Sequence, residues 1–169
     1  AGPFRAIPYL SCVTWAKASA ASQGPPAGGF VDDLLELAAP VADRIPLARV
    51  WSRDEAEWQC LRRPSAIAVG LDGETGRGLL TGYIMSIADA KRTKCLLVED
   101  VLWGALRPEE RSQLVRRLKS EAVTAGVRLA TVPMMGYADT NPFLENGFRP
   151  YRRVVHAHFS LWDGTSDAG

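Results

Sequence analysis

The chain has 169 residues, of which 47% are hydrophobic and 23% charged, a composition typical of one folded domain with a buried core. Twenty Lys and Arg residues against nineteen Asp and Glu residues give a formal net charge of +1, which excludes the strongly basic surface of a dedicated nucleic-acid-binding protein. No apolar run approaches the ~20 residues that span a bilayer, and the first residues lack a signal-peptide pattern. Three widely spaced cysteines and two histidines form neither a disulfide framework nor a metal site. We therefore expect a reduced, cytoplasmic globular protein, and the high content of Ala, Arg and Gly favours a bacterial source.

An N-terminal strand precedes the clearest boundary in the chain. Aromatic and β-branched residues over 4–15 predict this strand, and Pro8 favours a place at a sheet edge or at a bulge. Residues 16–29 are mostly Ala, Ser, Gly and Pro, which predicts a linker or a long loop. The expected division of the chain is an N-terminal strand over 1–15, the linker over 16–29, one domain over 30–162 and a disordered tail over 163–169.

Two helices are predicted after the linker. Apolar residues at helical spacing predict a helix over 30–39, which Pro40 ends. Ser52 and Glu55 have the spacing of a capping box, which predicts a second helix that runs to Pro64.

The remaining pattern predicts strands and one long helix. Residues 65–71 and 78–87 flank a Gly-rich turn over 72–76, which predicts a β-hairpin. The later elements expected are a strand over 94–103, a helix from Pro108 to Gly126, a strand over 127–134, a short helix over 141–146 and a strand over 152–162. This order is typical of an α/β fold whose sheet has parallel and antiparallel parts.

Two similar segments lie near the ends of the chain. Gly2-Pro3-Phe4-Arg5 with Pro8-Tyr9 resembles Gly147-Phe148-Arg149-Pro150-Tyr151, and a strand ending in Trp follows each. Either the likeness is a coincidence between two similar strands, or the chain begins with the last strand of a preceding, similar unit.

Several motifs between residues 67 and 162 follow one another in a recognisable order. They are a hairpin with Asp72-Gly73-Glu74 in its turn, the strand 96–102, the segment Leu106-Arg107-Pro108-Glu109-Glu110-Arg111, and the segment Asn141-Pro142-Phe143-Leu144-Glu145-Asn146-Gly147-Phe148. In this order they resemble the GNAT superfamily of acyl-CoA-dependent N-acyltransferases. The resemblance implies a GNAT-like α/β fold with a mixed, partly antiparallel central sheet flanked by helices. It also implies transfer of an acetyl or other acyl group from acyl-CoA to a primary amine by direct attack.

The resemblance implies roles for two kinds of residue. Glu99 or Asp100, which strand alternation places on opposite faces, would deprotonate the substrate ammonium; the alternative is one carboxylate in solvent and one paired with Arg or Lys. Phe143 stands where many members of the family carry a Tyr, so Tyr137 or Tyr151 would protonate the leaving thiolate unless both only pack. The residues expected to bind acetyl-CoA or another acyl-CoA are Val101, Leu102, Trp103, Arg111, Ser112, Gln113, Asn141 and Phe143.

The loop departs from the family pattern where the phosphates of CoA would bind. A helix N-terminus offers backbone N–H groups to a pyrophosphate, and the family's glycines allow close approach. Here Ser112-Gln113-Leu114 follows Arg111 in place of Gly-x-Gly. We therefore keep two functions, an N-acetyltransferase or related acyltransferase and an inactive GNAT-like domain that serves as a binding or structural part of a larger, tandem protein. A third, a carrier-bound acyl donor, would explain the loop because protein-held phosphopantetheine brings no pyrophosphate.

The partners expected are a small-molecule or peptide amine and either a second copy or an adjoining GNAT-like domain, with no nucleic acid and no membrane.

Overall fold

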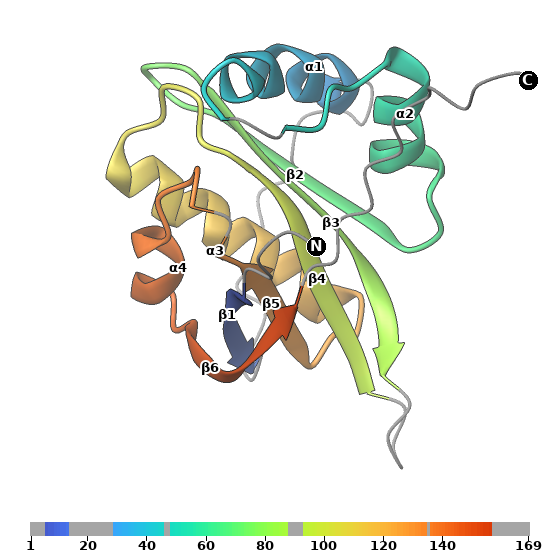
Figure 1. Ribbon diagram of the computed structural model, residues 1–169, viewed down its shortest axis with the longest axis vertical. Helices are drawn as coiled ribbons and strands as arrows, with labels where there is room; N and C mark the ends of the chain where they lie inside the picture. Colours follow the sequence, from blue (N-terminus) through green and yellow to red (C-terminus); the bar gives the residue numbers. More distant parts are fainter. Residues whose placement is uncertain (1–5, 14–28, 46–47, 88–92, 135, 157–169) are drawn as a thin grey trace, which may run out of the picture.

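The computed structural model describes residues 6–13, 29–45, 48–87, 93–134 and 136–156 (Figure 1). The predicted linker before Gly29, the predicted tail and residues 157–162 lie outside the described part. In chain order the elements are β1 (Ala6–Val13), α1 (Gly29–Ala42), α2 (Arg53–Glu57), η1 (Trp58–Arg62), β2 (Ala66–Asp72), β3 (Arg77–Ile87), β4 (Thr93–Leu102), α3 (Pro108–Thr124), β5 (Leu129–Pro133), α4 (Asn141–Glu145) and β6 (Arg149–His156).

The described strands form one mixed sheet in the order β2-β3-β4-β5-β1-β6. β4 and β5 are parallel, as expected for strands joined by the crossover helix α3, and the other neighbours are antiparallel. The sequence prediction of a mixed, partly antiparallel sheet is confirmed.

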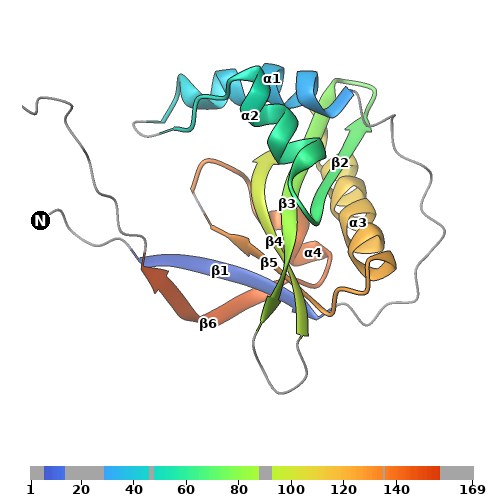
Figure 2. The same ribbon diagram turned by 90° about the vertical axis from the view of Figure 1, so that its right-hand side faces the viewer.

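Helices cover both faces of the sheet (Figures 1 and 2). Alternate residues of the central strands point to opposite faces of the sheet and so pack against different helices, as the pleat of a strand requires. Leu79 and Leu102 pack with α1, α2 and η1, whereas Leu80 and Val101 belong to the larger core formed with α3, α4 and β5. The central strands are therefore buried on both sides.

Local signals placed most helix and turn boundaries correctly. The hairpin of β2 and β3 is confirmed by seven antiparallel pairs from Ala66–Tyr83 to Asp72–Arg77. The capping box is also confirmed, because the Glu55 backbone N–H donates to the Ser52 hydroxyl (3.3 Å) and the Ser52 N–H donates to the Glu55 carboxylate (3.0 Å). Gly126, at φ +74°, ends α3 in the left-handed conformation that glycine adopts without strain.

Two helix predictions need correction. Pro40 does not end the first helix, since α1 continues to Ala42 with Pro40 inside it. A proline there removes only one late hydrogen bond, and the Arg44 Nε donates to the Pro40 carbonyl at 2.9 Å. The second predicted helix changes after Glu57 into the π-helical turn η1, where the Arg63 N–H bonds to the Trp58 carbonyl (2.7 Å) five residues earlier.

The N-terminal strand lies inside the sheet. β1 pairs with β5 on one side and β6 on the other, so the edge position that Pro8 suggested is wrong. The register with β6 shifts between Pro8 and Leu10, which confirms the alternative, an irregularity of the bulge type. β6 begins at Arg149, three residues before the predicted start.

Candidate active site

A β-bulge in β4 brings two carboxylates together. Thr81 of β3 is paired with Asp100, but the next residue, Gly82, is paired with Val98, so Glu99 is the extra residue of the bulge. Gly82 permits this close approach, because a Cβ atom there would lie 2.3 Å from the Leu97 carbonyl oxygen.

Glu99 and Asp100 belong to one hydrogen-bonded network. The Gln59 Nε2 donates to Glu99 Oε2 (2.6 Å) and to Thr81 Oγ1 (3.5 Å), and the Thr81 hydroxyl donates to Asp100. Arg63 Nη1 lies 2.5 Å from the same Glu99 oxygen and 3.1 Å from Gln59 Oε1. The expectation of opposite faces is therefore wrong, because the extra residue interrupts the alternation on which it depended.

The two carboxylates have different surroundings. Glu99 forms an ion pair with Arg63, whose guanidinium also stacks 3.6 Å from the centroid of the Tyr83 ring. Burial raises the pKa of Asp100, the hydrogen bond from Thr81 opposes that shift, and the charge of Glu99 adds to it. Because a carboxylate with a raised pKa holds a proton more strongly, Asp100 is suited to accept one.

The bulge lies beside the point where the parallel strands β4 and β5 separate, which we call the fork. Within the described range 93–134, the register of β4 with β5 covers Cys95–Leu97 against Leu129–Thr131, and both strands continue beyond it. A recess occupies this place. Its lining residues come from β4, β5, α4 and the segment between β5 and α4: Glu99, Val101, Val132, Pro133, Tyr137, Ala138, Thr140 and Phe143.

Tyr137 lines the same recess as Glu99. Burial raises the pKa of its phenol, the charge of Asp100 adds to this, and a hydrogen bond with the Val101 backbone opposes it. The phenol therefore keeps its proton near neutral pH and is able to donate it. Thus Glu99 and Tyr137 line one recess, and Asp100, which is next to Glu99 but does not line the recess, is close enough for its charge to raise the pKa of Tyr137. The side chain of Tyr151 lies outside the described part.

Three of the residues predicted to bind acyl-CoA lie at the recess or beside it. Val101 and Phe143 line it, and Trp103 packs against Phe143 with ring centroids 5.6 Å apart. Trp103 Nε1 also donates to the Asp139 carbonyl at 2.9 Å. Leu102 instead packs into the α1 layer on the other face of the sheet.

The other predicted binding residues surround the first turns of α3 and α4. Arg111 Nε donates to the Leu106 carbonyl (2.7 Å), and its Nη1 lies 3.6 Å from the Asp139 carboxylate. Ser112 is buried and donates to Glu145. Gln113 and Asn141 are exposed.

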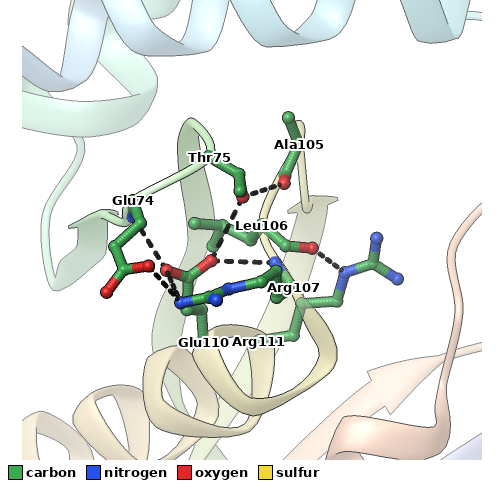
Figure 3. Close-up of polar contacts among 7 residues, drawn as sticks. All are labelled: Glu74, Thr75, Ala105, Leu106, Arg107, Glu110 and Arg111. Carbon is green, nitrogen blue, oxygen red and sulfur yellow. Dashed lines mark hydrogen bonds and ion pairs between the residues drawn. The ribbon is translucent and has the colours of Figure 1, made fainter.

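A glutamate occupies the start of α3 (Figure 3). The Glu110 carboxylate accepts the backbone N–H groups of Arg107 (2.8 Å) and Glu74 (2.8 Å) and also contacts the Thr75 hydroxyl (3.4 Å). These backbone bonds hold its pKa below the ordinary value, and Arg107 pairs with Glu74 at 2.8 Å. A charged carboxylate therefore lies where the family resemblance implied a pyrophosphate, and the residues at this helix start do not fit that group.

Sequence reasoning missed Glu110, Gln59, Arg63 and Thr81. Glu110 carried a local signal, because a Glu two residues after Pro108 stands at the third position of the helix, where it caps its own N-terminus. The other three come from η1, the residue after it and β3, and no local pattern joins them.

No protein-family model and no curated protein matches the sequence. The structure resembles Saccharomyces cerevisiae N-myristoyltransferase with bound myristoyl-CoA, with a TM-score of 0.54, 11% identity, and coverage of 85% of this chain and 46% of that one. A second structure of the enzyme, with bound myristoyl-CoA and inhibitors, has a TM-score of 0.53 and 11% identity, and the match covers 85% of this chain and 47% of that one. A third, with bound myristoyl-CoA, has a TM-score of 0.53 and 11% identity, and the match covers 85% of this chain and 48% of that one.

N-myristoyltransferase belongs to the GNAT-fold superfamily, so this likeness confirms the GNAT-like fold that the sequence predicts. At 11% identity it shows the fold alone, and the chain spans less than half the length of these neighbours. Within the described residues, no helix combines the length and apolar character needed to cross a membrane.

Proposed function

We propose that the protein is an N-acyltransferase that moves an acyl group from an acyl-CoA thioester to a primary amine. One observation carries the proposal: Glu99 and Tyr137 line the recess at the point where β4 leaves β5, and Asp100, next to Glu99, is close enough for its charge to act on Tyr137. The neighbouring structures with bound myristoyl-CoA support an acyl-CoA donor in general.

The fork suits an extended thioester arm. Where two parallel strands part, backbone groups of both edges face the gap, and an amide-containing chain can add to them as an extra strand. Val101, Val132 and Phe143 give the recess apolar walls. A thioester bound against these walls displaces water from them, which favours transfer to an amine over hydrolysis.

The transfer removes two protons from the nitrogen and adds one to the sulfur, and Asp100 and Tyr137 serve these steps. Asp100 accepts a proton from the substrate ammonium, and the freed amine lone pair attacks the thioester carbonyl carbon. The C–N bond forms, the C–S bond breaks, and the thiolate takes the phenolic proton of Tyr137. The nitrogen then gives up its second proton to the Tyr137 phenolate, which leaves a neutral amide and restores the phenol, and Asp100 releases the first proton to solvent. Glu99, held by Arg63 and Gln59, attracts the ammonium group and fixes its approach.

A thiol-release assay tests this proposal. Acetyl-CoA and myristoyl-CoA are each incubated with a panel of amino acids, amino sugars and peptides with free N-termini, and free CoA thiol is measured. For any active pair we expect Asp100→Asn and Tyr137→Phe each to lower kcat by about 100-fold or more, the usual size of a proton-transfer contribution. Glu121→Gln, an exposed position on α3, is the control and keeps full activity.

The second candidate is a GNAT-like domain without catalysis, which binds or supports a neighbouring domain. The carboxylate of Glu110 at the start of α3 favours it, because that carboxylate competes with CoA phosphates. Absence of thiol release with every acceptor, together with no binding of any acyl thioester, would establish this candidate in place of the enzyme.

A further inference from the structure

The start of α3 has few donors left for a phosphate. A pyrophosphate at a helix N-terminus is held by free backbone N–H groups of the first turn. Here the Arg107 N–H is bonded to Glu110, Pro108 has no N–H, and the Arg111 N–H is bonded to the Arg107 carbonyl at 2.9 Å, which leaves the N–H groups of Glu109 and Glu110 in the first turn. The hydroxyl of Ser112, the next side chain able to donate, is directed to Glu145.

The charge at this place is also unfavourable for an anion. Glu110, Glu109 and Glu74 surround the helix start, and Arg107 is already paired with two of these carboxylates, Glu74 and Glu110. The Arg111 guanidinium points away from these carboxylates (Figure 3). Its Nε donates to the Leu106 carbonyl, and its Nη1 lies 3.6 Å from the Asp139 carboxylate. A pyrophosphate would therefore meet a net negative surface.

The Glu110 carboxylate is built into the fold and is not readily displaced. Its residue is 9% exposed, and its carboxylate ties the hairpin turn between β2 and β3 to α3. Gly73 packs so closely that a Cβ atom there would lie 2.6 Å from the carboxyl group. Moving Glu110 aside would leave two backbone N–H groups without their acceptor.

Because the start of α3 is occupied by Glu110 while the recess between β4 and β5 is lined by apolar side chains, we infer that the donor site recognises the acyl thioester and its pantetheine arm and makes no contact with the pyrophosphate. The inference rests on the proposed function and narrows its donor class. A thioester of 4′-phosphopantetheine, free or attached to a carrier protein, serves this site as well as acyl-CoA does.

Calorimetric titration of the wild-type chain tests this without any knowledge of the acceptor. The probes are acetyl-CoA, acetyl-4′-phosphopantetheine and acetyl-pantetheine. We expect the dissociation constants of the first two to agree within about fivefold, the size of a single charge interaction in a solvent-facing site. Binding of acetyl-CoA more than fivefold tighter overturns the inference and leaves the proposed function standing. Binding of none of the three overturns the proposed function itself.

A charge variant gives an independent readout. Glu110→Gln keeps an acceptor oxygen but removes the charge, so we expect acetyl-CoA to bind roughly fivefold more tightly while acetyl-pantetheine binds as before. Glu109→Gln, one residue earlier and exposed, is the matched control and changes either constant by less than about twofold. Equal effects of the two variants would contradict the assigned role of Glu110.

A last titration distinguishes a donor attached to a carrier protein from a free thioester. The acetylated arm is presented on a purified acyl carrier protein and compared with the free acetyl-4′-phosphopantetheine. Tighter binding of the carrier-bound arm assigns the donor to a carrier protein, and weaker binding assigns it to a free thioester.

Discussion

Replacing Arg63 with Met tests whether the ion pair with Glu99 holds the carboxylate network together. The Arg63 and Glu99 side chains are 17% and 31% exposed, and their charged atoms lie 2.5 Å apart. Breaking a fully buried ion pair costs about 3–5 kcal/mol, whereas a fully exposed pair contributes about 0–1 kcal/mol. This pair lies between those limits, so the expected loss of unfolding free energy is about 2–3 kcal/mol, including the lost contact with the Tyr83 ring.

The loss is measured by urea denaturation at pH 7 and by thermal unfolding. For a chain of this size it corresponds to a fall in Tm of about 5–10 °C. Arg62→Met is the matched control, because Arg62 is 56% exposed and lies 3.5 Å from Glu57, and its expected cost is below about 1 kcal/mol.

A double variant separates the charge effect from lost packing. If an unpaired Glu99 carboxylate causes the loss, then Glu99→Gln added to Arg63→Met recovers about 1–2 kcal/mol. The reasoning is refuted if Arg63→Met costs no more than Arg62→Met, or if the second substitution deepens the loss.

Three further predictions concern stability. Burial raises the pKa of Asp100 above its value in the unfolded chain, so ionisation of this carboxyl destabilises the folded state. The wild type should therefore lose stability relative to Asp100→Asn as the pH rises from 4 to 8. An equal stability difference between the two proteins at pH 4 and pH 8 in urea denaturation contradicts this. Gly82→Ala should cost about 3 kcal/mol, since its Cβ atom meets the Leu97 carbonyl, whereas Gly29→Ala, with no atom within 4 Å, should be tolerated. Ser52→Ala should cost about 1 kcal/mol in the same assay by removing the cap of α2, and a neutral result would mean that the cap is not needed.

Local chemistry made much of the fold predictable. The turn residues between β2 and β3, the Ser52 cap and the Gly126 helix end each act within a few residues, so their effect can be recognised from sequence. Pro40 was misjudged because a proline close to the end of a helix removes only one late hydrogen bond, and neighbouring contacts decide whether the helix continues.

Sequence alone identified Glu99, Asp100 and Tyr137 as candidates, because carboxylates are unusual inside an apolar strand and because the family resemblance required a proton donor. Only the tertiary structure decided that Glu99 and Tyr137 line one recess and that Asp100 lies close enough to act on Tyr137. The bulge at Glu99 depends on the pairing of β4 with β3, and the approach of Tyr137 depends on where β5 parts from β4. Pairing between strands is a long-range property, and one extra residue reverses the side chains that follow it.

At the start of α3, where the phosphates of CoA were expected, sequence and tertiary structure again contributed different information. Sequence showed that the glycines of the cofactor loop are missing, which weakened the case for a bound pyrophosphate. The structure added what takes its place: the Glu110 carboxylate bonds to the Glu74 backbone, 36 positions earlier in the chain. That bond exists only because the hairpin turn and the start of α3 meet in three dimensions, and such a meeting leaves no pattern in the sequence around either residue.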